Sequence, residues 1–184
     1  MITTIKNLVL AAAFFSPLAV AHNIKLNQPL PKVDITDQGE LRLNRQSISY
    51  HAWNTDMLKG KVHIIQAMAG RIASKKMNAK VVDAIIAANL PKKTYQTTSI
   101  LNQDDALIGT GSLVKSSLED SKKEFPHSAM ILDSDGIAAK TWQLKDKSSA
   151  IILLDKQGIV RFVKDGKLTD NEVQVLISKT KALL

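Results

Sequence analysis

The chain has 184 residues, a formal net charge of +8 and no cysteine. Without a thiol it cannot carry out disulfide exchange or thiol-based peroxide reduction. The positive charge suits an anionic partner, but the lysines are scattered along the chain and aromatic residues are few. We therefore predict a solvated basic surface and no nucleic-acid binding.

Residues 1–21 are predicted to be a cleaved signal peptide. A single charge at Lys6 precedes an apolar run over residues 8–15, and Ala19-Val20-Ala21 has the small-x-small pattern that signal peptidase accepts. The run is shorter than the ~20 residues needed to cross a bilayer. We expect an exported mature chain, residues 22–184, that forms one domain and has no transmembrane segment.

The segment after the signal peptide is predicted to form a β-hairpin. Val33 and Ile35 alternate with polar residues, Asp37-Gln38-Gly39 is typical of a turn, and the alternation resumes at Leu41. Asn54 is a candidate helix cap. Around it lies an apolar cluster that we expect to pack beneath the sheet, formed by Tyr50, Trp53, Met57 and Leu58.

The stretch Gly60–Arg71 is predicted to be a buried strand that ends in a small-residue turn, and a helical pattern follows over residues 74–89. Residues 95–101 are rich in β-branched side chains and predict a second strand. A right-handed crossover makes the two strands parallel neighbours. Both strands therefore end at the same edge of the sheet, beside a helix N-terminus, where α/β domains usually keep their functional residues.

A further helix is predicted after Gly109-Thr110-Gly111, with Ser112 as its cap. Its inner face is predicted to carry Val114, Leu118 and Phe125. A strand over residues 129–132 and a short helix that ends near Trp142 follow.

The last third of the chain predicts a β-hairpin and a terminal helix. The strands cover residues 150–154 and 159–163, with a turn between them. Thr169 and Glu172 have the spacing of a capping box. The apolar residues on one face of the helix that follows are Val173, Leu176, Ile177 and Leu184.

This order of elements resembles the thioredoxin-like fold in the elaborated form of peroxiredoxins and membrane-tethered thiol-disulfide reductases. Three segments carry the resemblance: Gly60-Lys61-Val62, Leu132-Asp133-Ser134-Asp135-Gly136 and Leu154-Asp155-Lys156-Gln157-Gly158. It implies an α/β, three-layer thioredoxin-like fold with a mixed central sheet, a peroxiredoxin-style N-terminal hairpin and an insertion.

Nearly the whole chain also resembles the YtfJ family of exported gammaproteobacterial proteins. The matching segments are the signal peptide and the histidine after it, GKVHIIQAMAGR, YQTTSILNQDDALIGTGSLVKSSLE, TWQL, SSAIILLDKQG and KDGKLT. This resemblance implies a periplasmic thioredoxin-like protein, cleaved after Ala21, whose molecular activity is not settled.

The resemblance to thioredoxins also places the residues where thiol chemistry would occur. The two cysteines of a redox motif would fall at Ile72 and Lys75, and the proline that contacts substrate in a cis conformation would fall at Ser149. Neither Ile72 nor Lys75 can form a thiolate. A cis bond before serine costs several kcal/mol, roughly 3, so we expect a trans bond. We predict a protein with no thiol redox activity and no cofactor.

Our first functional hypothesis is a binding or scaffold module for a protein, a peptide or a small anion. Arg71 and the free N–H groups of the helix N-terminus would attract the ligand. The alternative is that Arg71 pairs with Asp104 or Asp105 and only joins two loops. The candidate ligand-binding residues are Arg71, Ser74, Lys75, Asp104, Asp105 and Ser149.

Two other hypotheses remain open. After cleavage His22 carries a free amine and an imidazole, which together can chelate copper if another histidine lies close by. The candidates for that second ligand are His51, His63 and His127. The last hypothesis is a thiol-independent enzyme, although no serine lies in a nucleophile elbow and no histidine–carboxylate pair can be recognised from the spacing.

Overall fold

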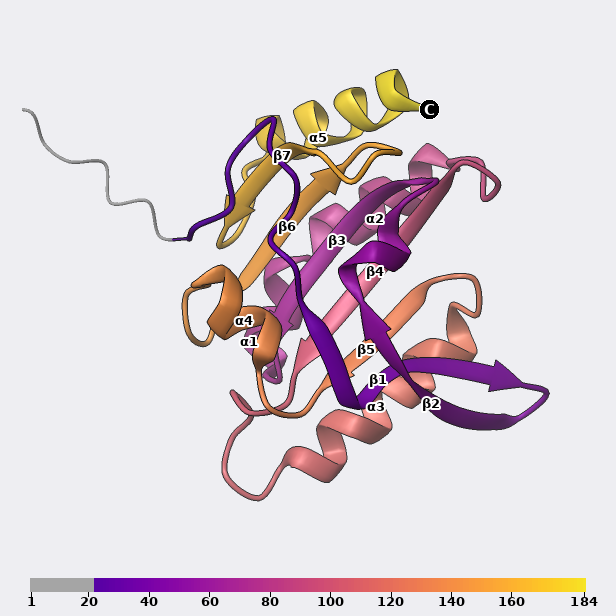
Figure 1. Cartoon of the computed structure of the whole chain (residues 1–184), viewed down its shortest axis with the longest axis vertical. Coiled ribbons are helices and arrows are strands. Elements are labelled where there is room, and N and C mark those ends of the chain that lie inside the picture. Colours follow the sequence, from indigo (N-terminus) through magenta and orange to yellow (C-terminus); the bar gives the residue numbers. More distant parts are fainter. Residues whose placement is uncertain (1–21) are drawn as a thin grey trace, which may run out of the picture.

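A computed structural model of the chain describes residues 22–184, so the predicted signal peptide lies outside the described residues. Its centre is a seven-stranded sheet with the order β2-β1-β5-β4-β3-β6-β7 (Figure 1). The strands are β1 (Asp34–Asn44), β2 (Ser47–Asn54), β3 (Val62–Ala69), β4 (Tyr95–Asn102), β5 (Ala129–Asp133), β6 (Ser149–Leu154) and β7 (Val160–Asp165). The helices are η1 (Thr55–Leu58), α1 (Ile72–Met77), α2 (Ala79–Ala88), α3 (Gly111–Glu124), α4 (Ile137–Trp142) and α5 (Asp170–Leu183).

The sheet is mixed, as the sequence predicted. Strand β3 pairs in parallel with β4, and β4 pairs in parallel with β5. On its other side β3 pairs antiparallel with β6, which forms a hairpin with β7. The parallel strands β3 and β4 therefore end at one edge of the sheet, where the candidate site was predicted.

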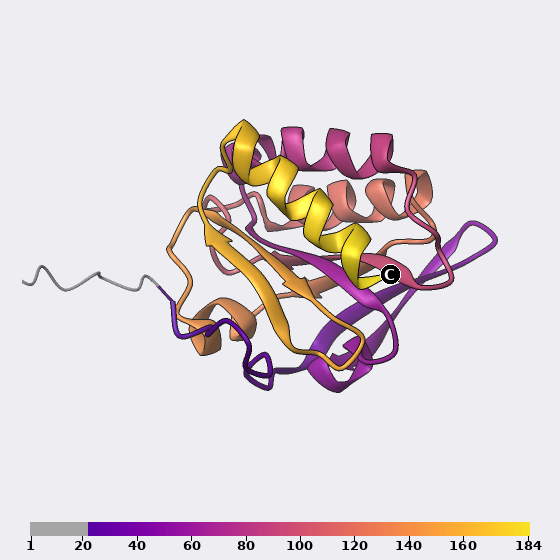
Figure 2. The ribbon, with the colours of Figure 1, turned by 90° about the horizontal axis from the view of Figure 1, so that it is seen from above.

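Helices cover both faces of the sheet, which gives three layers (Figure 2). One face carries α4, η1 and the N-terminal segment, which bury an apolar cluster that includes Trp53, Leu58 and Trp142. The other face carries α2, α3 and α5. There the core is divided into two clusters, one under α2 and α5 around Ile64 and Leu176, and another under α3 around Leu118.

The N-terminal hairpin exists, but its predicted turn was wrong. Strand β1 runs through Asp37-Gln38-Gly39, and the connection to β2 lies at Arg45 and Gln46. Gly39 has a φ of +77°, and a Cβ there would approach the His51 carbonyl oxygen to 2.2 Å. The pairing register shifts between Ile35 and Glu40. The glycine therefore allows an irregularity within one strand rather than a reversal of the chain.

Three expectations about the helices also need correction. The helix predicted over residues 74–89 is two helices, with a break at Asn78, whose side chain donates to Gln66 Oε1 at 3.0 Å. Helix α3 begins at Gly111 and has no side-chain cap, so Ser112 is not its cap. Phe125 follows the last residue of α3 and is exposed rather than buried on its inner face.

The predicted caps of the other helices are confirmed. Asn54 Oδ1 accepts a hydrogen bond from the Asp56 backbone N–H at the start of η1. Thr169 and Glu172 form the capping box of α5. In the apolar cluster beside Asn54, Trp53 and Leu58 are buried, whereas Met57 is exposed and Tyr50 is only partly buried. Within residues 22–184 no helix is long and apolar enough to cross a membrane.

Candidate functional site

Ile72 and Lys75 lie in the first turn of α1, the helix that follows the core strand β3. Ile72 is the first residue of α1, and its side chain is 77% exposed. Lys75 is also exposed, one turn further along. The chain thus presents an apolar side chain and a cation at the two positions predicted from the thioredoxin resemblance.

Arg71 is held by one of its two candidate partners. Its Nε lies 3.0 Å from Asp105 Oδ1, and both side chains are mostly buried. Asp105 Oδ2 also accepts a hydrogen bond from the Lys147 backbone N–H. Asp104 lies apart from this pair, because its Oδ2 is 2.9 Å from Lys140 Nζ. The ion pair that joins two loops, our alternative to a ligand-binding Arg71, is therefore present.

Ser74 is turned inward and joins the same group of residues. Its side chain is fully buried, and its Oγ donates to the Lys147 carbonyl oxygen at 3.2 Å. Lys147 has a φ of +56° and lies just before β6. Asp105 and Ser74 therefore fix both backbone polar groups of Lys147, so the loop before β6 is fastened from two sides.

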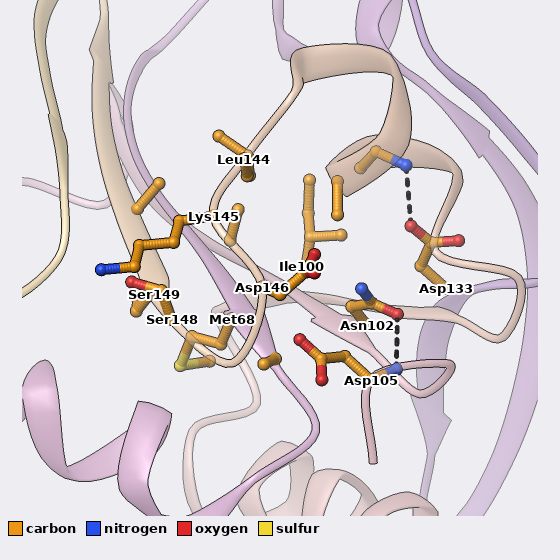
Figure 3. Close-up of a pocket in the computed structure, with 15 residues that line it drawn as sticks. Met68, Ile100, Asn102, Asp105, Asp133, Leu144, Lys145, Asp146, Ser148 and Ser149 are labelled. Atoms are coloured by element: carbon orange, nitrogen blue, oxygen red, sulfur yellow. Dashed lines mark hydrogen bonds between the residues drawn. The ribbon is translucent and has the colours of Figure 1, made fainter. Parts of the chain in front are cut away.

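Ser149 begins β6 and lies beside a very small cavity. No peptide bond within residues 22–184 is cis, so the bond before Ser149 is trans, as expected. Its Oγ is buried and has no hydrogen-bond partner among the described residues. The cavity has a volume of about 20 Å³ and is also lined by Asn102, Asp105 and Asp146 (Figure 3). This volume suits roughly one water molecule rather than a ligand.

Asp133 borders the same cavity, but its carboxylate binds backbone groups at the start of α4. Its two carboxylate oxygens accept the backbone N–H groups of Ile137 and Ala138, each at 2.8 Å. Burial raises the pKa of Asp133, although these two hydrogen bonds act in the opposite direction. The group therefore positions the start of α4 against the sheet.

A much larger opening lies on the face of the sheet that carries α2 and α3. This groove, which sequence reasoning missed, has a volume of about 550 Å³. Its floor is formed by side chains of the three parallel strands that point to this face, including Met68, Leu101 and Met130. Its walls are α1 and α2 on one side and α3 on the other. It occupies the gap between the two apolar clusters of this face.

The rim of the groove carries most of the exposed large apolar side chains of the described region. These are Ile72, Ile86, Leu107, Leu113 and Phe125. Lys75 also lines the groove, so both positions of the missing redox motif border it. The signal in the sequence was the apolar pair Leu107-Ile108 in a polar loop, together with Leu113 on the outer side of the next helix. Contiguous exposed apolar surface of this kind marks binding sites.

The histidines do not form a metal cluster in the described residues. His63 is buried in β3, and its Nδ1 lies 2.9 Å from Thr98 Oγ1. Burial, with a contribution from the charge of Lys61, lowers the pKa of His63 to about 4. Within residues 22–184 no group of three or more histidine, cysteine or acidic side chains could hold a metal ion.

The serines likewise show no nucleophilic arrangement with a histidine and an acid. Ser148 Oγ donates to Asp165 Oδ1 at 3.0 Å, and no histidine contacts this pair through a hydrogen bond in the described region. Ser49 Oγ lies 2.9 Å from His51 Nε2 on the exposed strand β2. No carboxylate among residues 22–184 hydrogen-bonds the other ring nitrogen of His51, so the third member of a catalytic triad is not seen there.

Comparison with known proteins gives one family and one fold. The model of the family described as "Bacterial protein of unknown function (YtfJ_HI0045)" matches residues 24–183. The chain is 45% identical over 179 residues to the uncharacterized protein YtfJ of Escherichia coli, with 97% of each chain covered. It is 41% identical over 175 residues to an uncharacterized protein of Haemophilus influenzae, with 95% of each chain covered.

Among solved structures, the fold is similar to the thioredoxin domain of a thiol-disulfide oxidoreductase from Bacteroides vulgatus. The TM-score is 0.57 at 13% sequence identity, and the match covers 85% of this chain and 98% of the other. At this identity the likeness shows the thioredoxin-like fold and nothing about activity. The absence of cysteine excludes the dithiol chemistry that the name of that protein indicates.

Proposed function

This chain belongs to the YtfJ family, and from that premise we propose that it is an exported, periplasmic binding module that works without thiol chemistry. It recognises its ligand in the groove between α2 and α3. Export is supported by the signal-peptide pattern of residues 1–21. Loss of those residues removes only Lys6 among the charged groups and leaves a mature chain with a formal charge of +7, which favours an anionic ligand or partner.

One observation carries the proposal: both positions of the missing redox motif border the groove. Ile72 places an exposed apolar side chain at its rim, and Lys75 places a cation beside it. The groove has a volume of about 550 Å³. Sites for small molecules typically have volumes of about 300–1,000 Å³ and mostly apolar walls with a few polar groups.

The hydrogen bonds around Arg71 support a structural role for this residue, which leaves the adjacent groove as the binding site. Arg71 pairs with Asp105, and Asp105 and Ser74 bind the backbone N–H and carbonyl groups of Lys147. A ligand that used Arg71 would have to break its ion pair with Asp105, at a cost in free energy. The exposed apolar side chains of the groove form no such pair, so a ligand can cover them without breaking a contact. Burying them under a ligand is favourable.

Photocrosslinking in living cells tests this function. A photoreactive amino acid replaces Leu113 on the wall of the groove, and in a second protein it replaces Lys181 on the exposed side of α5. We expect a specific adduct from position 113 and not from position 181. The adduct should disappear in Ser117→Trp, which fills the groove, and persist in Ser116→Trp, a neighbouring exposed position that does not line it.

The same adducts at both positions, or an adduct from position 113 that Ser117→Trp leaves intact, would show that the groove is not the binding site. Reduction of a peroxide or a disulfide by the purified mature chain would contradict the other half of the proposal.

A further inference from the structure

The lining of the groove is continuous along helix α3. The residues of α3 that face it recur every three or four positions, from Leu113 and Val114 near its start to Glu124 at its end. This spacing is that of one helix face. The groove therefore runs along the whole helix rather than forming a round pocket at one end.

The length of the groove matches one extended acyl chain. From Val114 to Phe125 the helix rises roughly 16 Å at 1.5 Å per residue. The hydrocarbon core of a bilayer is about 30 Å thick, so the acyl chain of one leaflet spans about 15 Å. The surface of the groove is mostly apolar along this length, with Ser117 and Ser121 on the α3 wall and Asn78 on the opposite wall. The floor contributes Met68 and Met130, whose flexible side chains adapt to an irregular ligand.

Charge distinguishes the two ends of the groove. At the end beside α1, Lys75 is exposed and forms no ion pair within residues 22–184, whereas the charge of Arg71 is neutralised by Asp105. The start of α3 is adjacent, since a Cβ on Gly70 would lie 3.3 Å from Val114 Cγ1. At the opposite end Glu124 lines the groove, and the buried Lys122 Nζ donates to the carbonyl oxygen of Ser128, another lining residue. An amphiphile with a negative head therefore meets an exposed, unpaired cation at the α1 end, where Lys75 lies.

From these observations we infer that the groove binds a long-chain fatty acid, with the acyl chain along α3 and the carboxylate beside Lys75. The inference rests on the proposed function, because it names the ligand of the same groove. Apolar walls provide the affinity, through burial of the acyl chain. Lys75 fixes the direction in which the ligand enters.

Titration calorimetry with palmitate, kept below the concentration at which it forms micelles, tests the inference on the mature chain of residues 22–184. We expect one palmitate per protein. Ser117→Trp should weaken binding at least tenfold by filling the groove, whereas Ser116→Trp should change it less than twofold. Leu113→Asp, at a side chain that is 67% exposed, is a second variant that removes apolar wall without altering the core.

A pair of charge reversals tests the assignment of the head group. Lys75→Glu should weaken palmitate binding by roughly fivefold to tenfold, the range expected when an exposed ion pair becomes a repulsion. Lys76→Glu makes the same charge change at an exposed neighbour that does not line the groove, and it should change binding less than twofold. Hexadecanol, which has the same chain and no charge, should bind more weakly than palmitate.

Several results would overturn the inference. Two concern palmitate itself: no binding, or equal affinity for the two tryptophan variants. The others are a higher affinity for hexadecanol or a lysophospholipid than for palmitate, and a concentration-dependent dimer that Ser117→Trp abolishes. If palmitate fails while the crosslinked adduct still depends on Ser117, the fatty-acid assignment is wrong and the binding function stands. If the adduct is also insensitive to Ser117→Trp, both fail.

Discussion

Arg71 Nε and Asp105 Oδ1 lie 3.0 Å apart and connect the end of β3 to the loop after β4. The same aspartate binds the backbone N–H of Lys147, so one carboxylate holds three segments that are distant in the sequence. These contacts lie beside the start of α1. They keep one end of the groove in a fixed shape.

Arg71→Ala is expected to destabilise the fold by roughly 1–2 kcal/mol, because it leaves the mostly buried Asp105 with an unpaired charge. Lys140→Ala is the matched control, since it removes an ion pair to the neighbouring Asp104 that is exposed on both sides. Chemical denaturation should show a lower midpoint for Arg71→Ala and an unchanged one for Lys140→Ala. Equal midpoints for the two variants would show that burial of the Asp105 pair has no consequence for stability.

Gly70→Ala is expected to destabilise the protein by about 1–3 kcal/mol through a steric clash. A Cβ at this position would lie 2.8 Å from the Asn102 carbonyl oxygen, which accepts the Gly70 N–H, so the backbones of β3 and β4 would have to separate. Gly111→Ala is the control, because there the nearest atom is the end of the Gln103 side chain at 3.3 Å. Thermal unfolding compares the two variants. An unchanged midpoint for Gly70→Ala would show that the backbones of β3 and β4 do not approach so closely at this position.

The double variant Ile72→Cys/Lys75→Cys is expected to form an intrachain disulfide. The two positions are exposed, three residues apart at the start of α1, and about 5–6 Å apart between Cβ atoms, so a slight adjustment of the first turn closes the bond. Mass spectrometry after mild oxidation should show the loss of two hydrogens per chain. A control pair, Ala73→Cys/Lys76→Cys, has the same spacing one residue further into the helix and should oxidise less readily. Equal oxidation of both pairs would argue against a special geometry at residues 72 and 75.

The stability of the protein should depend on pH through His63. Its pKa is about 4 in the folded chain and about 6.5 when unfolded, because burial disfavours the charged ring. Between these values the unfolded chain binds a proton that the folded chain does not. The free energy of unfolding therefore falls as the pH drops from about 6.5 to about 4, by on the order of 2–3 kcal/mol.

His63→Gln provides the comparison for this pH dependence. Glutamine does not titrate, so the difference in unfolding free energy between the two proteins should shrink as the pH falls through this range. Urea titrations at several pH values between 4 and 8 measure it. Parallel pH profiles for the two proteins would mean that His63 is protonated as easily in the folded chain as in the unfolded one.

The sequence predicted the elements whose signals are local. The buried strand β3 and the capping box at Thr169 follow from periodicity and cap chemistry over a few residues. The position of Ile72 at a helix start came only from the resemblance to thioredoxins, since periodicity predicted that the helix begins at residue 74. The turn at Gly39 was wrong because a glycine with a positive φ serves an irregular strand and a turn equally well. Distinguishing the two requires knowledge of which residue lies opposite, and that depends on the partner strand.

The candidate site shows the same limit. Its location at the ends of β3 and β4 could be predicted, but the choice between Asp104 and Asp105 as the partner of Arg71 could not, because adjacent residues in a loop can point in opposite directions. The groove was missed for another reason. It results from the distance between α2 and α3 across the sheet, and that distance cannot be predicted from the sequence of either helix.

Helix α3 rests on an apolar cluster of its own, around Leu118 and Leu132, and the groove separates it from the core shared by α2 and α5. Local opening of α3 therefore need not disturb that core. Its amide hydrogens should exchange with deuterium at a lower free energy of opening than those of β3, and a ligand in the groove should slow that exchange. The groove proposed to bind a ligand would then also make α3 the part of the molecule that detaches most easily when nothing is bound.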